Sequence, residues 1–199
     1  MEKFLTIFKQ RRSIYNLSNT IGITNEQLVR LLQEVIVNSP TAFNSQSSKV
    51  VLLLAKNHEH FWNHLVLSIL EKITSSLAFE KTKQKINGFA NAYGTILFFD
   101  DTSITESLMT KYPTYQAMFH QWADHASGMQ QIAVWTVLTE AGIGASLQHY
   151  NPVIDDEIKK AYAINPKWRL IAQMPFGIPL SKANEKTTKS ADELVKVIL

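Results

Sequence analysis

Hydrophobic residues recur at helical spacing over several long stretches of the chain, and this spacing predicts most of its helices. The N-terminal stretch predicts a helix over residues 2–12, and a second helix runs from Thr24 to Pro40. Thr24 and Gln27 form a capping-box pattern at its start, and Pro40 ends it. The apolar positions that define the two helices are Phe4, Leu5, Ile7 and Phe8, then Leu28, Leu31, Leu32, Val35 and Ile36.

Further along the chain, the same periodicity predicts helices over residues 59–80 and 82–91 and a long helix over 113–141. The long helix carries almost no charge, and a helix that is apolar nearly all round belongs in a core or at a subunit interface. Two shorter helices are expected to follow, one from about Asp155 and one at the capping box of Ser190 and Glu193.

Apolar runs rich in β-branched and aromatic residues separate these helices and predict strands. They cover residues 48–55, 93–101 and 168–179, and the segment "GIGASLQHYNP" turns from the long helix into a further short strand. Long helical segments, sometimes more than one, lie between the strands without a regular alternation. This order predicts an α+β fold in which a mixed sheet is buried between helices.

The composition fits one globular domain over residues 1–199. Of the 199 residues, 45% are apolar and 19% are charged, and no linker rich in Pro, Gly or Ser divides the chain. A C-terminal extension is expected from about residue 178. Arg11 and Arg12 interrupt the N-terminal stretch before an apolar segment of the length found in signal peptides can form. No apolar run is long enough to span a bilayer. We therefore expect a soluble, cytoplasmic protein without membrane association.

Charge and cysteine content exclude several classes of function. The formal net charge is only +3, and cations such as Lys159, Lys160 and Arg169 are interspersed with acids and apolar residues. No basic face is predicted, so nucleic acid is not an expected partner. The chain has no cysteine, which excludes thiol nucleophiles, thiolate metal sites and disulfides.

One loop is unusually rich in short hydrogen-bonding side chains. It lies in "NSPTAFNSQSSKVVLLL", between the second helix and the first strand, and it carries almost no charge. A turn needs one or two such residues, whereas this loop has seven. The neutral groups that converge there are Ser39, Thr41, Asn44, Ser45, Gln46, Ser47 and Ser48.

The histidines do not predict a metal site. His60 and His64 in "HEHFWNH" stand at i and i+4, which suits a metal on a helix. The zincin pattern, however, needs its second histidine three residues after Glu59, where the chain has Trp62. No carboxylate or cysteine completes the pair, and a partly buried or exposed helix face is the simpler interpretation.

Two further patterns have structural explanations. Asp100 and Asp101 follow a strand, but adjacent strand residues point to opposite faces, so we expect them to cap a helix near Ser103 rather than act as a pair. Gly142 and Gly144 follow a helix and open a strand, the reverse of a dinucleotide-binding loop. Gly142 is expected to end that helix, and Gly144 to allow a close backbone approach that would suit a flat ligand.

Arg11, Arg12 and Ser13 combine two guanidinium groups with a hydroxyl at the end of the first predicted helix. Such a set suits a phosphate or the electron-rich edge of a ring. The alternative is that the arginines only stabilise the C-terminus of that helix.

Taken together, these motifs resemble the FMN-dependent nitroreductase family, and its short-chain branch in particular. The resemblance covers essentially the whole chain in order and is carried by "RRSIY", "SPTAFNSQ", "YGTILFFDD", "GIGASLQHYNP" and "FGIP" with "EKTTKSADELV". It implies an intertwined homodimer with two FMN sites at the subunit interface.

The resemblance also implies roles for individual residues. Arg11, Arg12 and Ser13 match a motif that contacts the flavin pyrimidine edge and its phosphate, and Lys186 matches a phosphate-binding lysine. The loop residues match a segment that reaches the flavin of the other subunit, and residues 147–149 match a strand whose backbone passes near flavin N5. These two segments contribute Pro40, Thr41, Ala42, Asn44 and Gln46, and Leu147, Gln148 and His149.

The implied activity is reduction of nitroaromatics, quinones or similar electrophiles by NADH or NADPH through ping-pong hydride transfer at the flavin. No side chain is expected to act as a catalytic acid or nucleophile. Two alternatives stay open: an enzyme of the same fold with another acceptor, and a flavin-binding regulatory or storage protein with little turnover. The residues expected to line the acceptor pocket, or to lie in the core instead, are Phe79, Phe89, Phe119 and Trp122.

The chain departs from the family pattern at three positions. Ser47 stands where larger members have Pro, and Tyr15 replaces a lysine two residues beyond the arginine motif. Thr188 replaces an arginine of the tail, with Lys182 or Lys189 as substitutes. These departures leave open which cation lies nearest flavin N1.

Overall fold

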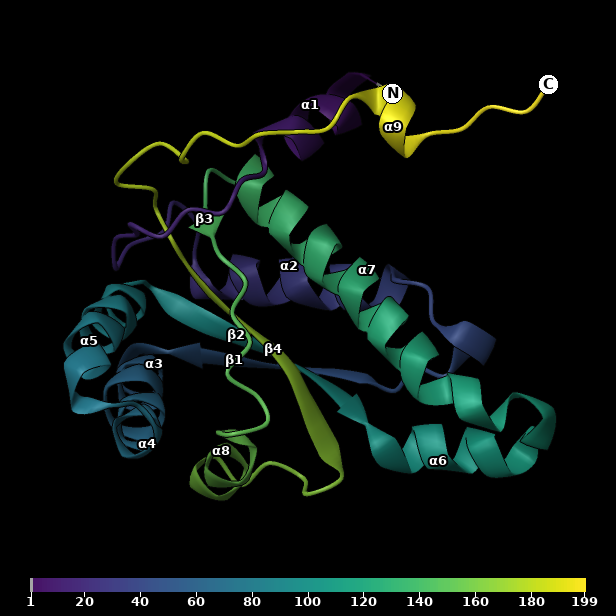
Figure 1. The fold of residues 1–199 in the computed structure, drawn as a ribbon, viewed down its shortest axis with the longest axis horizontal. Coiled ribbons are helices and arrows are strands. Elements are labelled where there is room, and N and C mark those ends of the chain that lie inside the picture. Colours follow the sequence, from purple (N-terminus) through teal and green to yellow (C-terminus); the bar gives the residue numbers. More distant parts are fainter. Residues whose placement is uncertain (1) are drawn as a thin grey trace.

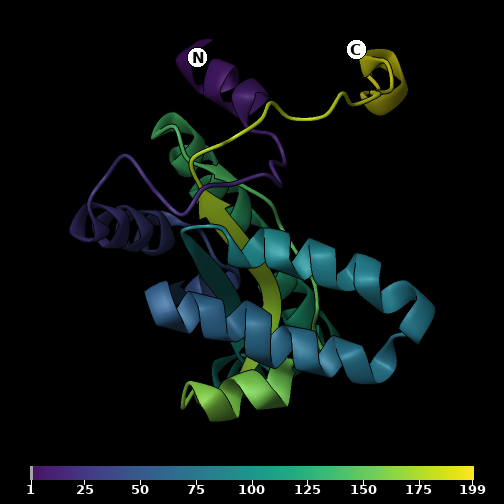
Figure 2. The same cartoon turned by 90° about the vertical axis from the view of Figure 1, so that its left-hand side faces the viewer.

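The computed structural model describes residues 2–199, in which helices cover both faces of a four-stranded sheet (Figures 1 and 2). The strands are β1 (Ser48–Leu54), β2 (Gly94–Asp101), β3 (Gly144–Ala145) and β4 (Trp168–Gly177). Their order is β1-β2-β4-β3, and each neighbouring pair is antiparallel. An isolated parallel bridge joins Ser13 to Ala145 outside the named strand pairs.

Helices form most of the remaining chain. Short 3₁₀ segments lie before β1 and before the longest helix, and a π-helical segment joins α3 to α4. In chain order the helical elements are α1 (Glu2–Gln10), α2 (Asn25–Asn38), η1 (Ala42–Asn44), α3 (Ala55–His60), η2 (Phe61–Val66), α4 (Leu67–Ile73), α5 (Ser76–Ala90), α6 (Thr102–Lys111), η3 (Pro113–Met118), α7 (Phe119–Glu140), α8 (Asp155–Ala161) and α9 (Ala191–Leu194).

The alternation of side chains along β2 creates two cores. Leu97 and Phe99 point to one face and pack with η2, α4, α5 and α8, whereas Ile96 and Phe98 point to the other and pack with α2 and α7. All eight residues of β2 are buried. The predicted sandwich of a sheet between helices is therefore confirmed, because a strand covered on both faces needs apolar residues at consecutive positions.

Several predicted boundaries are wrong in informative ways. The helix expected to begin near residue 59 begins at Ala55 and continues through η2 to Ile73. The break expected near residue 81 lies instead at Thr74 and Ser75, where the backbone is extended and Ser75 precedes α5. The long helix predicted from residue 113 starts at Phe119, because Pro113 opens a separate 3₁₀ segment.

Local capping signals gave correct predictions. Thr24 accepts a hydrogen bond from the backbone N–H of Gln27, whose side chain accepts one in return. The Asp101 carboxylate caps α6 by accepting from the backbone of Ser103. Gly142 has φ +73° just after α7, a conformation that glycine adopts without steric cost.

The close approach at Gly144 involves the protein's own chain rather than a flat ligand. A Cβ there would lie 2.8 Å from Cγ of Pro179 and 3.1 Å from Cδ2 of Leu17. The expectation that Gly144 makes room for a ligand is therefore corrected. The space beside Gly144 is filled by the side chains of Leu17 and Pro179.

Within residues 2–199, no helix combines the length and the apolar character that crossing a membrane requires. In the histidine segment, the His60 and His64 rings stack with centroids 5.4 Å apart. In the described part of the chain, no group of three or more His, Asp or Glu side chains is placed to hold a metal ion.

Gly177→Ala is expected to destabilise the fold by about 1–3 kcal/mol, because a Cβ would overlap the carbonyl oxygen of Ser18. Gly88→Ala in α5 is the control, since a Cβ there meets no atom within 4 Å and alanine favours helix by up to about 1 kcal/mol. Chemical denaturation of both variants measures the two effects. Equal stabilities would show that Ser18 does not restrict the end of β4.

Candidate functional site

Arg11 lies immediately after α1 in a half-buried position. Its backbone N–H donates to the carbonyl of Ile7 at 2.9 Å, and its guanidinium lies 4.4 Å from the centre of the Trp135 ring on α7. Nε of Arg11 and Nε1 of Trp135 are both buried and have no hydrogen-bond partner among residues 2–199. Two orphaned donors at one place indicate a position where an acceptor is needed.

The charge at this position is not neutralised within the described chain. No carboxylate of residues 2–199 lies within 4.0 Å of either Arg11 or Arg12. Burial lowers the pKa of Arg11, and the adjacent charge of Arg12 lowers this pKa further. The alternative that the arginines only stabilise the end of α1 does not explain why Arg11 turns away from water and onto an indole ring.

The backbone places Ser13 and the segment 145–149 next to each other. Ser13 bridges Ala145, and the N–H of Ile14 donates to the Ala145 carbonyl at 2.9 Å. Leu147 follows two residues later, roughly 7 Å along the extended chain. The structure thus brings together two of the predicted groups of site residues.

Along residues 147–149, the backbone groups of Gln148 bond to the sheet, whereas the N–H groups on either side of it do not. Gln148 exchanges two backbone hydrogen bonds with Gln173, at 2.7 and 2.9 Å, and its side chain donates to Ser146. Its backbone groups and its side-chain nitrogen are therefore already used. The N–H groups of Leu147 and His149 donate no backbone hydrogen bond within residues 2–199, which leaves them available.

The C-terminal segment also approaches the arginine pair. Arg12 donates from Nη2 to the carbonyl of Asn184. Lys186 lies two residues beyond Asn184 and is exposed. Extended chain advances about 3.3–3.6 Å per residue, so Lys186 can bring a further positive charge to Arg12.

The polar loop is partly held by its own side chains. The hydroxyl of Ser39 donates to the carbonyl of Val35 at 2.7 Å, and that of Thr41 accepts from the N–H of Gln46 at 3.1 Å. Ser47 is buried. Asn44 remains exposed, and its side chain makes no hydrogen bond among residues 2–199.

Three residues of this loop have left-handed backbone conformations. Phe43, Asn44 and Gln46 have φ values of 55°, 50° and 50°, which are sparsely populated for residues other than glycine. Such strain persists only where the surroundings fix it, and it is frequent at functional sites.

An aromatic cluster supplies those surroundings. The ring of Phe43 lies 4.8 Å from that of Tyr112, 5.4 Å from Phe119 and 5.8 Å from Trp122, centre to centre. Sequence reasoning missed Phe43, because only its left-handed backbone turns this apolar residue toward η3 and α7. Of the four expected pocket aromatics, Trp122 lies in the small cavity beside Pro40 and Phe43, whereas Phe89 is in the core.

The predicted site residues form two groups at different ends of α7 (Figure 1). Arg11 contacts Trp135, whereas Pro40 to Phe43 line a cavity with Trp122. The two tryptophans are separated by thirteen residues, and a helix rises 1.5 Å per residue, so the groups lie roughly 20 Å apart. One copy of the chain does not bring both groups to a single small molecule.

The chain also aligns with known proteins over nearly its whole length. A family model described as the nitroreductase family matches residues 8–178. The nitroreductase FRM2 of Saccharomyces cerevisiae is 32% identical over 187 residues, which cover 92% of each chain. The chain belongs to the nitroreductase family. This membership supports an oxidoreductase role.

Solved nitroreductases share its fold. The nitroreductase CinD of Lactococcus lactis, in complex with nicotinic acid, is 34% identical and has a TM-score of 0.90, with 98% of this chain and 99% of that chain covered. A nitroreductase of Desulfitobacterium hafniense with bound FMN is 14% identical, with a TM-score of 0.72 and full coverage of both chains. At that identity the likeness shows the fold alone.

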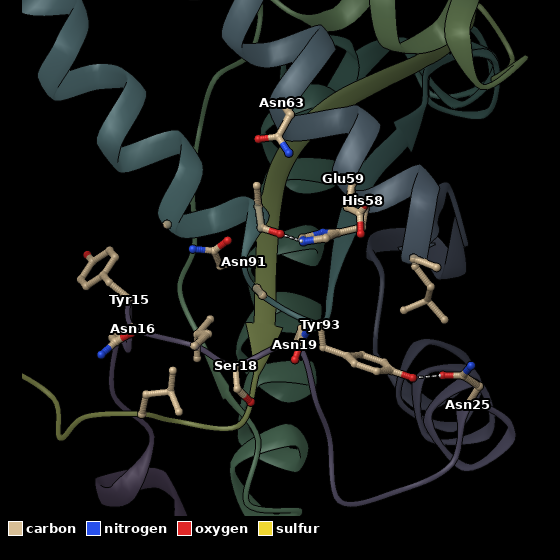
Figure 3. A pocket seen from close by; sticks show the side chains of 17 residues that line it. Tyr15, Asn16, Ser18, Asn19, Asn25, His58, Glu59, Asn63, Asn91 and Tyr93 are labelled. Atoms are coloured by element: carbon tan, nitrogen blue, oxygen red, sulfur yellow. Dashed lines mark hydrogen bonds between the residues drawn. The ribbon is translucent and has the colours of Figure 1, made fainter.

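Another cavity of this nitroreductase chain lies elsewhere, and a buried histidine forms part of its wall (Figure 3). Nε2 of His58 lies 3.1 Å from the carbonyl of Ala90, which can only accept, so Nε2 carries the proton. Nδ1 then accepts from the Thr95 hydroxyl at 2.9 Å, and that hydroxyl accepts from Nε1 of Trp62 at 2.8 Å. His58 is therefore satisfied as a neutral ring.

Burial lowers the pKa of His58 from its usual value of about 6.5. Because the folded protein disfavours the charged ring, this contribution to stability is present above pH 6.5 and is lost as the pH falls below it. We expect ¹⁵N NMR to show the neutral Nε2–H form at pH 7 and a midpoint below 6.5. A midpoint at or above 6.5 would contradict the assigned hydrogen bonds.

Proposed function

We propose that this protein is an FMN-dependent oxidoreductase that uses NADH or NADPH to reduce nitroaromatics, quinones or similar electrophiles. One observation carries the proposal: Arg11 is half-buried, stacked on Trp135 and unpaired, with Arg12 beside it. A buried guanidinium without a carboxylate is costly unless a ligand supplies the acceptors. The phosphate and the ring edge of FMN would supply them.

The residues present suit both the phosphate of FMN and the pyrimidine edge of its ring. Arg11 and Arg12 offer planar forks of donors, which match the oxygen atoms of a phosphate or the carbonyl and nitrogen atoms of the pyrimidine edge. Ser13 adds a hydroxyl, and Lys186 can add a second cation for the phosphate. The free N–H groups at Leu147 and His149 lie along the same edge and suit ring atoms that accept hydrogen bonds.

The loop supplies neutral contacts from a second subunit. Pro40, Thr41 and Ala42 give a small apolar surface, and the exposed amides of Asn44 and Gln46 suit uncharged carbonyl and ring-nitrogen atoms. Because the loop lies roughly 20 Å from Arg11 along α7, each site would take the arginines of one subunit and the loop of its partner. A two-fold dimer would then hold two equivalent sites.

Exposed apolar surface supports this homodimer. No residue of α1 is buried, and Phe4 and Phe8 are 62% and 42% exposed beside α7. The tail also projects away from the body of the chain (Figure 1), with Val197 71% and Ile198 84% exposed. Surfaces of this kind are normally covered by a partner.

When bound, FMN would accept electrons from the nicotinamide donor and pass them to the acceptor. The part played by the protein's own residues is mainly electrostatic. Arg11 and Arg12 would stabilise negative charge at the pyrimidine edge, and their low exposure would strengthen this effect. The aromatic residues around Phe43 would exclude water and offer flat faces to an aromatic acceptor. Structures of CinD with chloramphenicol and with 4-nitrophenol, at 32% identity, support acceptors of this class.

Arg11→Ala is expected to weaken FMN binding by about 10- to 150-fold, because a charge-assisted hydrogen bond contributes roughly 1.5–3 kcal/mol. Titration of the apoprotein with FMN, followed by flavin fluorescence, measures the change. Arg30→Ala is the matched control, since Arg30 is exposed on α2 and forms no ion pair within residues 2–199. Full FMN affinity in the Arg11 variant would remove the main support for the site.

Anaerobic addition of NADH or NADPH tests whether the protein is an oxidoreductase. We expect the visible flavin absorbance to bleach and to return when a nitroaromatic or a quinone is added. If FMN binds but neither donor bleaches it, the protein is a flavin carrier rather than an oxidoreductase.

Deletion of residues 195–199 is expected to shift the protein from dimer toward monomer and to lower FMN retention, because both effects depend on contact with a partner. Light scattering gives the mass, and absorbance gives the flavin content. Leu77→Ser is the control, since Leu77 is 96% exposed on α5, apart from α1, α7 and the tail. A truncated protein that stays dimeric and fully loaded would show that the tail has no such role.

A further inference from the structure

A cavity of about 720 Å³ is lined by polar and apolar side chains from several elements. Figure 3 shows Tyr15 at one end, Tyr93 with Asn25 at the other, and Asn91 between them. None of the residues assigned above to FMN lines this cavity. The cavity adjoins the proposed cofactor site, since Tyr15 lies two residues beyond Ser13, but the two share no assigned residue.

Side-chain amides dominate its polar lining. Four of them make no hydrogen bond among residues 2–199, and a fifth, on Asn25, accepts from the hydroxyl of Tyr93 at 2.6 Å and keeps both of its donors. Each free amide offers two donors and an acceptor. The four free amides belong to Asn16, Asn19, Asn63 and Asn91.

The charges of the lining restrict the class of ligand. Among the described residues that line the cavity there is no lysine or arginine, and the one carboxylate belongs to Glu59. His58 is neutral and has both ring nitrogens occupied. A phosphorylated or carboxylated ligand would therefore find no compensating charge.

The backbone of the cavity wall is strained at one residue. Ala55 lines the cavity with φ 48°, a left-handed conformation that costs a residue with a Cβ of the order of 1 kcal/mol. It lies where β1 turns into α3, three residues before His58. The hydrogen bonds of His58 to Thr95 and Ala90 tie α3 to β2 and to the end of α5. Of the free amides, Asn63 and Asn91 belong to these tied segments.

We propose that this cavity binds a neutral, polyhydroxylated molecule of the size of a mono- or disaccharide. Amide groups that offer a donor and an acceptor side by side match adjacent hydroxyl groups, which also donate and accept. The Glu59 carboxylate can accept from two hydroxyls, and the exposed ring of Tyr15 provides a face for the C–H side of a sugar ring. Flat apolar acceptors would leave the amides unpaired, at a cost in binding.

Saturation-transfer NMR on the full-length, FMN-loaded protein tests the proposal with glucose, galactose, mannose, maltose, sucrose and trehalose as probes. We expect saturable binding of at least one of these sugars. The double substitution Asn63→Ala and Asn91→Ala should weaken it by about tenfold or more, since two hydrogen-bonding groups are lost. Glucose 6-phosphate should bind at least about tenfold more weakly than glucose, because the lining has no cation.

Asn87→Ala is the matched control, since Asn87 is an exposed asparagine on α5 outside the cavity lining. Its sugar affinity should equal that of the parent protein. If the double variant does not fold, Tyr15→Ala replaces it, because Tyr15 is 51% exposed at the rim and carries no core packing. Flavin absorbance of each sample reports on the cofactor site separately.

Absence of binding by all six sugars would overturn the proposal. The same holds if the cavity variants bind sugar as well as the parent protein does, or if the phosphorylated sugar binds as tightly as glucose.

Discussion

The length of α7 is the constraint on which the rest of this structure depends. Its 22 residues hold the arginine pair near one end and the strained loop near the other. Both groups pack against the same helix. Neither can therefore move toward the other unless the core between α7 and the sheet is disrupted. If the two groups share one ligand, they must come from different copies of the chain. Family membership, the exposed face of α1 and the projecting tail all agree with such an arrangement.

Much of the fold was predictable because its signals are local or periodic. The capping pair of Thr24 and Gln27, the cap at Asp101 and the left-handed Gly142 depend on residues a few positions apart. The apolar run of β2 showed that a strand was covered on both faces, which is a property of the strand itself. The break between α4 and α5 was misplaced although Ser75 stands at the N-cap of α5, because Ser75 makes no side-chain capping hydrogen bond and the pattern does not mark the boundary.

The candidate site was less predictable, because its contacts join distant parts of the chain. Arg11 and Trp135 are far apart in sequence, and no local pattern pairs a cation with a particular indole. Phe43 was overlooked for a related reason: a phenylalanine inside a polar loop has no periodic partner, and its ring, on a backbone with φ 55°, packs against Tyr112 and the aromatic residues of α7. The polar residues of the loop were noticed, but some of them, such as Ser39 and Thr41, serve the loop's own backbone.

The left-handed turn at Phe43 links two regions that would otherwise be independent. Each such residue raises the energy of the loop by the order of 1 kcal/mol, and the rings of Tyr112, Phe119 and Trp122 offset that energy by packing. Any molecule that displaces one of these rings therefore also changes the preferred shape of the loop. Occupancy of the aromatic cluster and the geometry of Asn44 and Gln46 are thermodynamically coupled, and the coupling acts equally in both directions.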